Sequence, residues 1–155
     1  MMSLKEKITQ DIKTAFKGKD SEKTGILRLL ANAINQKEIE KRGRNEELTE
    51  EDVLAVLKTE AKKRKEAARQ FQEGGRPELA EKEEKELVLI KEYLPEEMSE
   101  EKVRELADEA IKETGALSAK ETGKVMAALM PKLKGAADGA LVGQIVREKL
   151  SGNNE

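Results

Sequence analysis

The sequence predicts an all-α protein, and three observations lead to that fold class. Apolar residues recur at intervals of three and four along most of the chain, which is the period of a helix with one buried face. Charged residues make up 40% of the composition and aromatic residues only 2%. Such a balance suits helices with narrow Ala and Leu stripes, because strands favour more aromatic and β-branched side chains. Glycines, prolines and capping residues then divide the chain into segments of helical length.

The first part of the chain, residues 1–95, is predicted to be an N-terminal helical domain. Its four helices begin at capping residues or a proline and end at a glycine or before a proline; they cover about 3–17, 20–42, 49–73 and 77–93. The inner face of the first helix is predicted to comprise Leu4, Ile8, Ile12 and Phe16. The short Gly74-Gly75 turn predicts that the third and fourth helices form an antiparallel hairpin.

The second part, residues 96–151, is predicted to be a C-terminal bundle of three helices. Helix starts are indicated at Ser99, Ser118 and Asp138, each of which can cap a helix. Pro131 is expected to end or kink the second of these helices, because proline lacks an N–H and clashes with the preceding turn. Pro95 to Met98 is the expected domain boundary. Because the bundle is small, it is expected to be only marginally stable on its own.

The composition excludes several kinds of chemistry. The chain has no cysteine and no histidine, which removes thiol nucleophiles, imidazole bases and most zinc sites. Four of its five serines stand at predicted helix starts, where a hydroxyl serves as a cap, and adjacent acid pairs such as Glu96-Glu97 point in different directions on a helix. We therefore expect no catalytic residue, no cofactor and no metal. No signal peptide or membrane span is indicated, so a cytoplasmic location is expected.

Positive charge gathers in the last third of the chain. Ala119 to Leu150 holds six basic and three acidic residues, whereas the whole chain carries a net charge of −2. The candidate phosphate-binding residues are its cations and the glycines that allow close backbone approach: Lys120, Gly123, Lys124, Lys132, Lys134, Gly135 and Arg147. The alternative interpretation is local, because lysines near a helix C-terminus are also stabilised by its exposed carbonyls.

The third predicted helix has two further charged features. Its cations recur at spacings of four, three and four, which forms a second basic stripe: Lys58, Lys62, Lys65 and Arg69. This stripe either follows a phosphate backbone, or is a solvated face, or pairs with the acidic fourth helix. Arg64 instead falls within the apolar seam of the helix, where a guanidinium needs a partner. The antiparallel hairpin predicts a structural ion pair between Arg64 and Glu83 or Glu86.

Three motifs in the last third carry a resemblance. They are Gly123-Lys124-Val125-Met126, Leu129-Met130-Pro131-Lys132 and the run from Lys134-Gly135 to Asp138-Gly139. They resemble the signature of the YqeY family, which is similar to the tail domain of GatB, a component of the tRNA-dependent amidotransferase. The resemblance extends upstream through residues 93–101, and weakly to 26–30 and 63–65. Gly143 stands where the family is expected to carry asparagine.

The resemblance implies a tRNA-binding or amidotransferase-associated module, linked to carbon–nitrogen ligase activity with glutamine as amide donor. tRNA, amidotransferase subunits or other translation proteins are the implied partners. Since no nucleophile is visible, the chain is expected to be non-catalytic on its own. The alternative is a protein-interaction or regulatory module that uses the acidic middle, since Gly74 to Glu113 holds fourteen acidic and seven basic residues. A free-standing amidotransferase is the weakest alternative.

Overall fold

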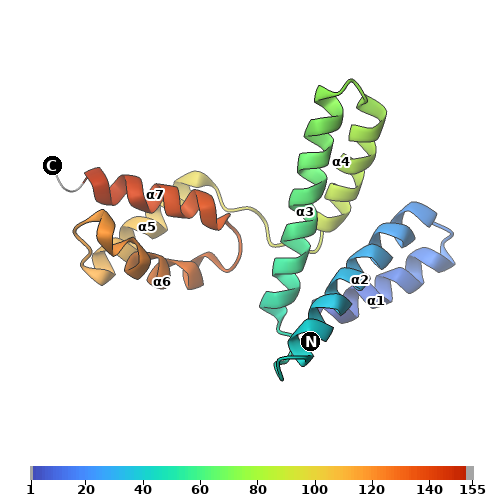
Figure 1. Ribbon diagram of the computed structural model, residues 1–155, viewed down its shortest axis with the longest axis horizontal. Coiled ribbons are helices and arrows are strands. Elements are labelled where there is room, and N and C mark those ends of the chain that lie inside the picture. Colours follow the sequence, from blue (N-terminus) through green and yellow to red (C-terminus); the bar gives the residue numbers. More distant parts are fainter. Residues whose placement is uncertain (1, 153–155) are drawn as a thin grey trace. The chain divides into compact units, whose positions relative to one another are not determined.

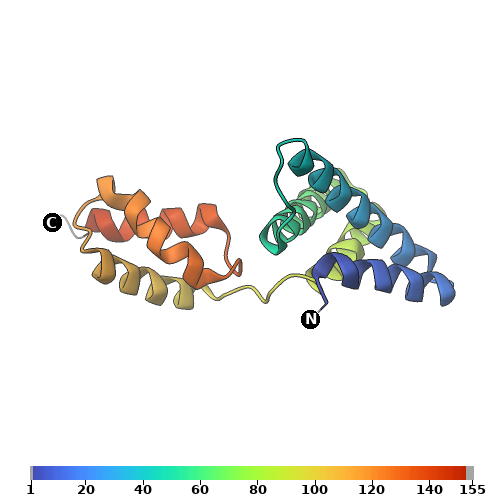
Figure 2. The same cartoon turned by 90° about the horizontal axis from the view of Figure 1, so that it is seen from below.

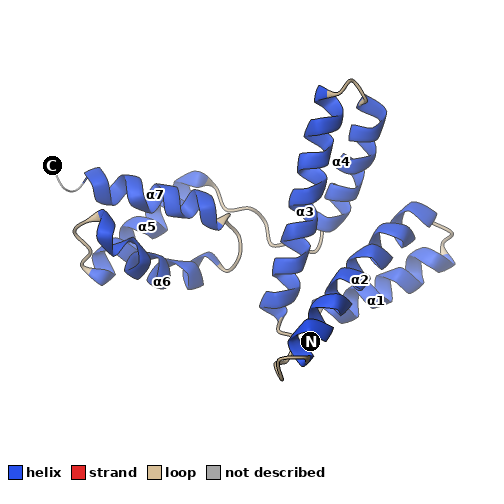
Figure 3. Ribbon diagram, in the orientation of Figure 1, coloured by secondary structure: helices blue, strands red, loops and turns tan. Residues whose placement is uncertain are grey.

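The computed structural model describes residues 2–152 and shows an all-α fold, as predicted. Within this range there are seven α-helices, one 3₁₀ turn and no strand (Figures 1 and 3). The elements in chain order are α1 (Leu4–Lys17), α2 (Ser21–Arg42), α3 (Glu50–Glu73), α4 (Pro77–Lys91), α5 (Glu100–Thr114), η1 (Ala119–Glu121), α6 (Thr122–Leu133) and α7 (Gly139–Gly152).

Two compact units make up the chain, Met1–Leu94 and Pro95–Glu155. In the N-terminal unit, α1 and α2 form one antiparallel pair and α3 and α4 form another, joined by a turn at Gly74 and Gly75 (Figures 1 and 2). α2 packs on both α1 and α3. The core of this unit is formed by Ile8, Ala15, Ile26, Leu27, Leu30, Ile34, Val53, Leu57, Ile90 and Tyr93.

Local capping explains where these helices begin. The Ser3 hydroxyl accepts a hydrogen bond from the Glu6 N–H, and the Glu6 carboxylate accepts one from the Ser3 N–H. Thr49 and Asp52 form the same reciprocal box at the start of α3. Each box satisfies two backbone donors that the first helical turn leaves without partners.

The prediction that Phe16 belongs to the inner face of α1 is wrong: its side chain is 65% exposed. Leu4, Ile8, Ile12 and Phe16 are spaced by four residues, and each such step rotates about 40° around a helix of 3.6 residues per turn. By the third step the side chain has turned away from the core. Ala15, seven residues after Ile8, returns to the buried side instead.

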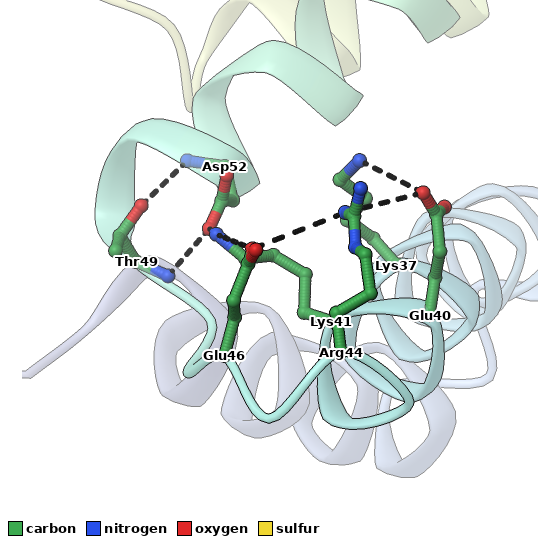
Figure 4. Close-up of polar contacts among 7 residues, drawn as sticks. All are labelled: Lys37, Glu40, Lys41, Arg44, Glu46, Thr49 and Asp52. Atoms are coloured by element: carbon green, nitrogen blue, oxygen red, sulfur yellow. Dashed lines mark hydrogen bonds and ion pairs between the residues drawn. The ribbon is translucent and has the colours of Figure 1, made fainter.

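An ionic corner joins the end of α2 to the start of α3 (Figure 4). Lys41 Nζ lies 2.7 Å from Asp52 Oδ2 and 3.5 Å from a carboxylate oxygen of Glu46. The hydrogen bond from Lys41, with those from Thr49, lowers the pKa of Asp52 to about 2. Asp52 therefore stabilises the cap of α3 and also holds α2 against it.

The C-terminal unit packs α5, α6 and α7 around an aliphatic core. Its buried residues are Val103, Ala107, Ala110, Ala116, Val125, Leu129, Leu133, Val142, Ile145, Val146 and Leu150. Ser99 caps α5 by accepting a hydrogen bond from the Lys102 N–H, and α5 ends at Gly115 in the left-handed region. Asp138 accepts a hydrogen bond from the Ala140 N–H at the start of α7.

The expected break at Pro131 is not where α6 ends. The helix continues to Leu133 with Pro131 inside it, and the chain turns at Lys134 and Gly135, whose φ angles are 49° and 77°. Proline removes one N–H, but Pro131 is on the exposed side of the helix. The carbonyl left without a donor one turn earlier therefore faces water, and the helix tolerates the loss.

Candidate functional site

The first group of predicted contact residues lies at the start of α6. The Glu121 carboxylate accepts hydrogen bonds from the N–H groups of Leu117 and Ser118, and these bonds lower the pKa of Glu121. This arrangement sets the η1 turn, so that Lys120 and Lys124 project into solvent one helical turn apart. Neither lysine lies within ion-pair distance of a carboxylate in the described part of the chain, although the charge of Lys124 also contributes to the lowered pKa of Glu121.

Gly123 lies between these two lysines. It is exposed, and a Cβ built on it would meet no atom within 4 Å. No side chain therefore shields the first turn of α6 on this side. A bare backbone flanked by two cations without ion pairs lets a phosphate approach both the lysines and the peptide groups closely.

Arg147 lies on α7, which runs antiparallel to α6 and returns past its start (Figures 1 and 2). α7 contacts η1 directly. The guanidinium of Arg147 lies over Gly143: its Nη1 is 3.5 Å from the point where a Cβ would stand. Gly143 is buried, whereas Arg147 is exposed and has no ion pair within residues 2–152. Because Gly143 has no side chain, the guanidinium of Arg147 can pack directly over the α7 backbone at this position.

The second group lies at the other end of α6. Lys132 Nζ is 2.6 Å from Glu113 Oε1 and 3.7 Å from Glu109 Oε2, both on α5, and its pKa is raised by the hydrogen bond to Glu113. Lys132 therefore connects two helices. Lys134 is exposed at the turn, beside Gly135. The turn is held to the chain before α5 by a 2.8 Å hydrogen bond from the Met98 N–H to the Ala136 carbonyl.

Charge is divided among the helices of this unit. α5 holds six acidic and three basic residues, whereas residues 122–152 hold five basic and two acidic ones. Part of the basic charge of residues 122–152 is neutralised by α5, because Lys149 pairs with Asp108 at 2.8 Å and Lys132 pairs with Glu113 at 2.6 Å. Outside α5, the described cations of this unit that form no ion pair are Lys120, Lys124, Lys134 and Arg147.

The structure thus separates the predicted residues into two places. Lys120, Gly123 and Lys124 lie at the start of α6, and Arg147 lies on the half of α7 that returns to it. Lys132, Lys134 and Gly135 lie at the opposite end of a helix that is roughly 18 Å long at 1.5 Å per residue. The pairing of Lys132 with Glu113 had no local signal, since the two residues are 19 positions apart.

The basic stripe on α3 is partly neutralised by the helix itself. Lys58 is half-buried, and Lys62, Lys65 and Arg69 are exposed. Arg69 forms ion pairs with Glu66 and Glu73, its neighbours at three and four positions, and these raise its pKa. Ion pairs of this spacing are typical of a solvated helix face.

Arg64 is buried, with 7% of its surface exposed. Its ion-pair partners in the described structure are Glu60, on the same helix, and Glu86, on α4. The Nε of Arg64 lies 3.5 Å from Glu86 Oε2, but the geometry makes no hydrogen bond and leaves this nitrogen unsatisfied. Glu60 was not predicted, although its position four residues before Arg64 is a recognisable helix-pair spacing. Glu83 is not among the partners.

Two features of the described residues concern metal binding and membrane crossing. No group of three or more acidic, histidine or cysteine side chains within residues 2–152 is arranged to hold a metal ion. In the same range, each helix is too short or too polar to cross a bilayer.

Comparison with known proteins now identifies the chain. The model of the Yqey-like protein family matches residues 5–150. The chain belongs to this family. A relative is an uncharacterized protein of Schizosaccharomyces pombe, 49% identical over 51 residues, which are 33% of this chain and 42% of that protein. The match thus spans less than half the length of this relative. The YqeY resemblance is confirmed, and the likeness to the GatB tail domain stays a prediction.

Proposed function

We propose that the C-terminal unit binds tRNA through phosphate contacts, as a non-catalytic module associated with tRNA-dependent amidotransferase or another translation protein. The observation that carries the proposal is a pair of exposed lysines, Lys120 and Lys124, on either side of the bare backbone of Gly123. Arg147, which is exposed and forms no ion pair within residues 2–152, adds a third cation on α7, the helix that contacts η1. Lys134 adds a contact at the far end of α6. The predicted association with amidotransferase rests on the family resemblance.

The mode of binding follows from the side chains present. All three aromatic residues, Phe16, Phe71 and Tyr93, belong to the N-terminal unit, so the C-terminal unit offers no ring on which a base can stack. Its cations recognise phosphates, which carry no sequence information directly. The module is therefore expected to bind tRNA species with similar affinity and to rely on the shape of the folded RNA.

A salt-titrated binding assay with bulk tRNA tests the proposal. Four phosphate contacts predict a slope of log K against log salt of about −3 to −4, since each contributes about −0.9 on duplex-like nucleic acid. The variant Lys120→Glu/Lys124→Glu is expected to weaken binding strongly and to reduce the slope by about 2. Lys112→Glu is the matched control, because Lys112 is an exposed lysine of α5 on the acidic helix.

Lys132 needs separate treatment. Reversing its charge opposes Glu113 and Glu109, so Lys132→Glu is expected to lower the melting temperature as well as any affinity. Binding that ignores both salt and the Lys120→Glu/Lys124→Glu change would overturn the proposal. Such a result would favour the alternative, a protein-interaction module that uses the acidic helices α4 and α5.

A further inference from the structure

α2 carries an uncharged stripe along its exposed face. The residues of this α2 stripe follow one another at spacings of four, three, four, three and four, and all are exposed: Gly25, Leu29, Asn32, Gln36, Ile39 and Gly43. Such spacing keeps side chains on one side of a helix, as in the seam of a coiled coil. No member is charged, in a chain whose composition is 40% charged. The stripe is therefore unlike an ordinary solvated helix face.

Its apolar members, Leu29 and Ile39, are among the exposed large apolar side chains of the N-terminal unit. Leu29 is 45% exposed and Ile39 is 65% exposed, while the opposite side of α2 is buried against α1 and α3. Phe16 adds a third exposed apolar side chain nearby, because the guanidinium of Arg28, the residue before Leu29, lies 5.4 Å from the centre of its ring.

Gly25 is a second observation that points to a partner. A glycine inside a helix costs roughly 0.5–1 kcal/mol relative to alanine. Within residues 2–152 no close contact requires the glycine here, since a Cβ at this position would meet no atom within 4 Å. A flat, uncharged helix surface with a missing side chain favours the close approach of another helix. It does not favour a nucleic acid, whose phosphates need cations.

We propose that the α2 stripe pairs with the α2 stripe of a second copy of this chain, in antiparallel orientation. The order of residues is self-complementary in that orientation. Leu29 of one copy meets Ile39 of the other, Asn32 meets Gln36, and Gly25 meets Gly43. In each pair the two residue numbers add up to the same total, so all six layers form in one register. In every layer a residue then faces one of the same chemical kind.

Apolar burial, hydrogen bonding and the helix dipoles all favour this pairing. The two Leu–Ile layers remove exposed apolar surface from water, and the two amide layers allow hydrogen bonds that fix the register, as polar residues do in coiled-coil seams. Antiparallel helices also oppose their macrodipoles favourably. Only one helix per copy contributes, so the interface is small and the dimer is expected to be weak and concentration-dependent. The proposal does not depend on tRNA binding, which uses the other unit.

The first experiment measures the mass of the full chain by sedimentation over a wide concentration range. Wild type is expected to shift from monomer to dimer as concentration rises. Leu29→Glu and Ile39→Glu are each expected to weaken association about tenfold or more, because each places an unpaired charge in an apolar layer. Val88→Glu is the control: Val88 is 61% exposed but lies on α4, away from the stripe.

The second experiment uses cysteine cross-linking to test the orientation, and its background is low because the chain has no cysteine of its own. A mixture of Leu29→Cys and Ile39→Cys chains is expected to form disulfide-linked heterodimers. Leu29→Cys alone is not, because the register separates the two copies of residue 29 by about ten helical residues, roughly 15 Å, and a disulfide needs Cα atoms within about 7 Å.

Three outcomes would overturn the proposal. The first is a monomer at every concentration; if Leu29→Glu also lowered the melting temperature, an intramolecular partner would cover the stripe instead. The second is a dimer that both glutamate variants leave intact, which would place the interface elsewhere. The third is efficient cross-linking of Leu29→Cys to itself, which would show parallel pairing.

Discussion

The two units hold their helices together by different means. In the N-terminal unit, polar groups enter the interior: Thr24, Glu60 and Arg64 are the buried polar residues among those described, and the buried Tyr93 donates a hydrogen bond to Asp11. The core of the C-terminal unit is aliphatic throughout its described residues. Its ion pairs, such as Lys149 with Asp108, join helices at the surface.

This difference separates two ways of specifying a helix bundle. A buried charge penalises any arrangement that leaves it without a partner, so Arg64 restricts how α3 and α4 can pair. An aliphatic core tolerates more arrangements, and its uniqueness depends on caps and turns such as those at Ser99 and Lys134.

The independence of the two units is tested most directly by cutting the chain between them. Limited proteolysis is expected to cleave near residues 95–98, and fragments 1–94 and 95–155 are each expected to be helical by circular dichroism. The smaller fragment should melt at the lower temperature, because small domains bury less of their surface. A C-terminal fragment that is unfolded alone, or a connection resistant to protease, would contradict the independence of the units.

Removing the buried guanidinium is expected to have the largest effect of any single substitution considered. Arg64→Ala leaves the buried Glu60 carboxylate with only the exposed Lys63 as an ion-pair partner in the described structure, and should cost about 3 kcal/mol of unfolding free energy. Chemical denaturation measures this loss. Lys65→Ala, an exposed neighbour, should change stability by no more than about 0.5 kcal/mol.

A double substitution sharpens the interpretation of Arg64. Glu60→Met/Arg64→Met replaces both charges with apolar groups and should lose less stability than Arg64→Ala, since no buried charge is then left without a partner. Equal losses for Arg64→Ala and Lys65→Ala would instead show that the guanidinium contributes nothing to the hairpin.

An intermediate effect is expected at Tyr93. Its hydroxyl donates a hydrogen bond to Asp11. Burial of the ring and this hydrogen bond raise the pKa of the tyrosine. Tyr93→Phe keeps the ring but removes the hydrogen bond to a charged group, which should cost about 1–3 kcal/mol. Lys132→Met, which removes a surface ion pair in the C-terminal unit, should cost less. The reverse order in thermal unfolding would reject the distinction between interior and surface polar contacts.

A small gain is expected at the corner of the C-terminal unit. Lys134 has a left-handed backbone with φ 49°, which a residue with a Cβ adopts at a cost of about 1–2 kcal/mol. Lys134→Gly should therefore raise the stability of that unit by about 1 kcal/mol. Asn45→Gly, at φ 57°, should gain less, because asparagine tolerates this region better. A loss of stability in Lys134→Gly would mean that the lysine side chain stabilises the turn.

The least perturbing test uses pH at the ionic corner. The folded pKa of Asp52 is lowered to about 2 from 3.8. Its contribution to stability is therefore present above pH 3.8 and is lost as pH falls toward 2. In Asp52→Asn this part of the acid destabilisation should disappear. The melting temperature of each protein is plotted against pH. If the two plots stay parallel through this pH window, Asp52 does not contribute to the acid destabilisation.

Local chemistry explains why much of the fold could be predicted. A cap involves residues three positions apart, so Ser3, Thr49 and Ser99 identified helix starts without any knowledge of their neighbours in space. Glycines at positive φ, such as Gly115, likewise end or redirect the chain by their own backbone freedom. The candidate cations of the tail were found in the same way, because charge can be read directly from composition.

The fold class, the family and most of the helix boundaries follow from the sequence alone, although α6 continues past Pro131 to Leu133. Only the tertiary structure decided which side chains meet: Lys132 pairs with α5, Phe16 faces outward, and Arg64 takes Glu60 as well as Glu86. The physical reason is that capping and turn formation act within one helical turn, whereas pairing across helices depends on how each helix is rotated toward its neighbours. A drift of about 40° per four residues is enough to move a side chain from core to surface.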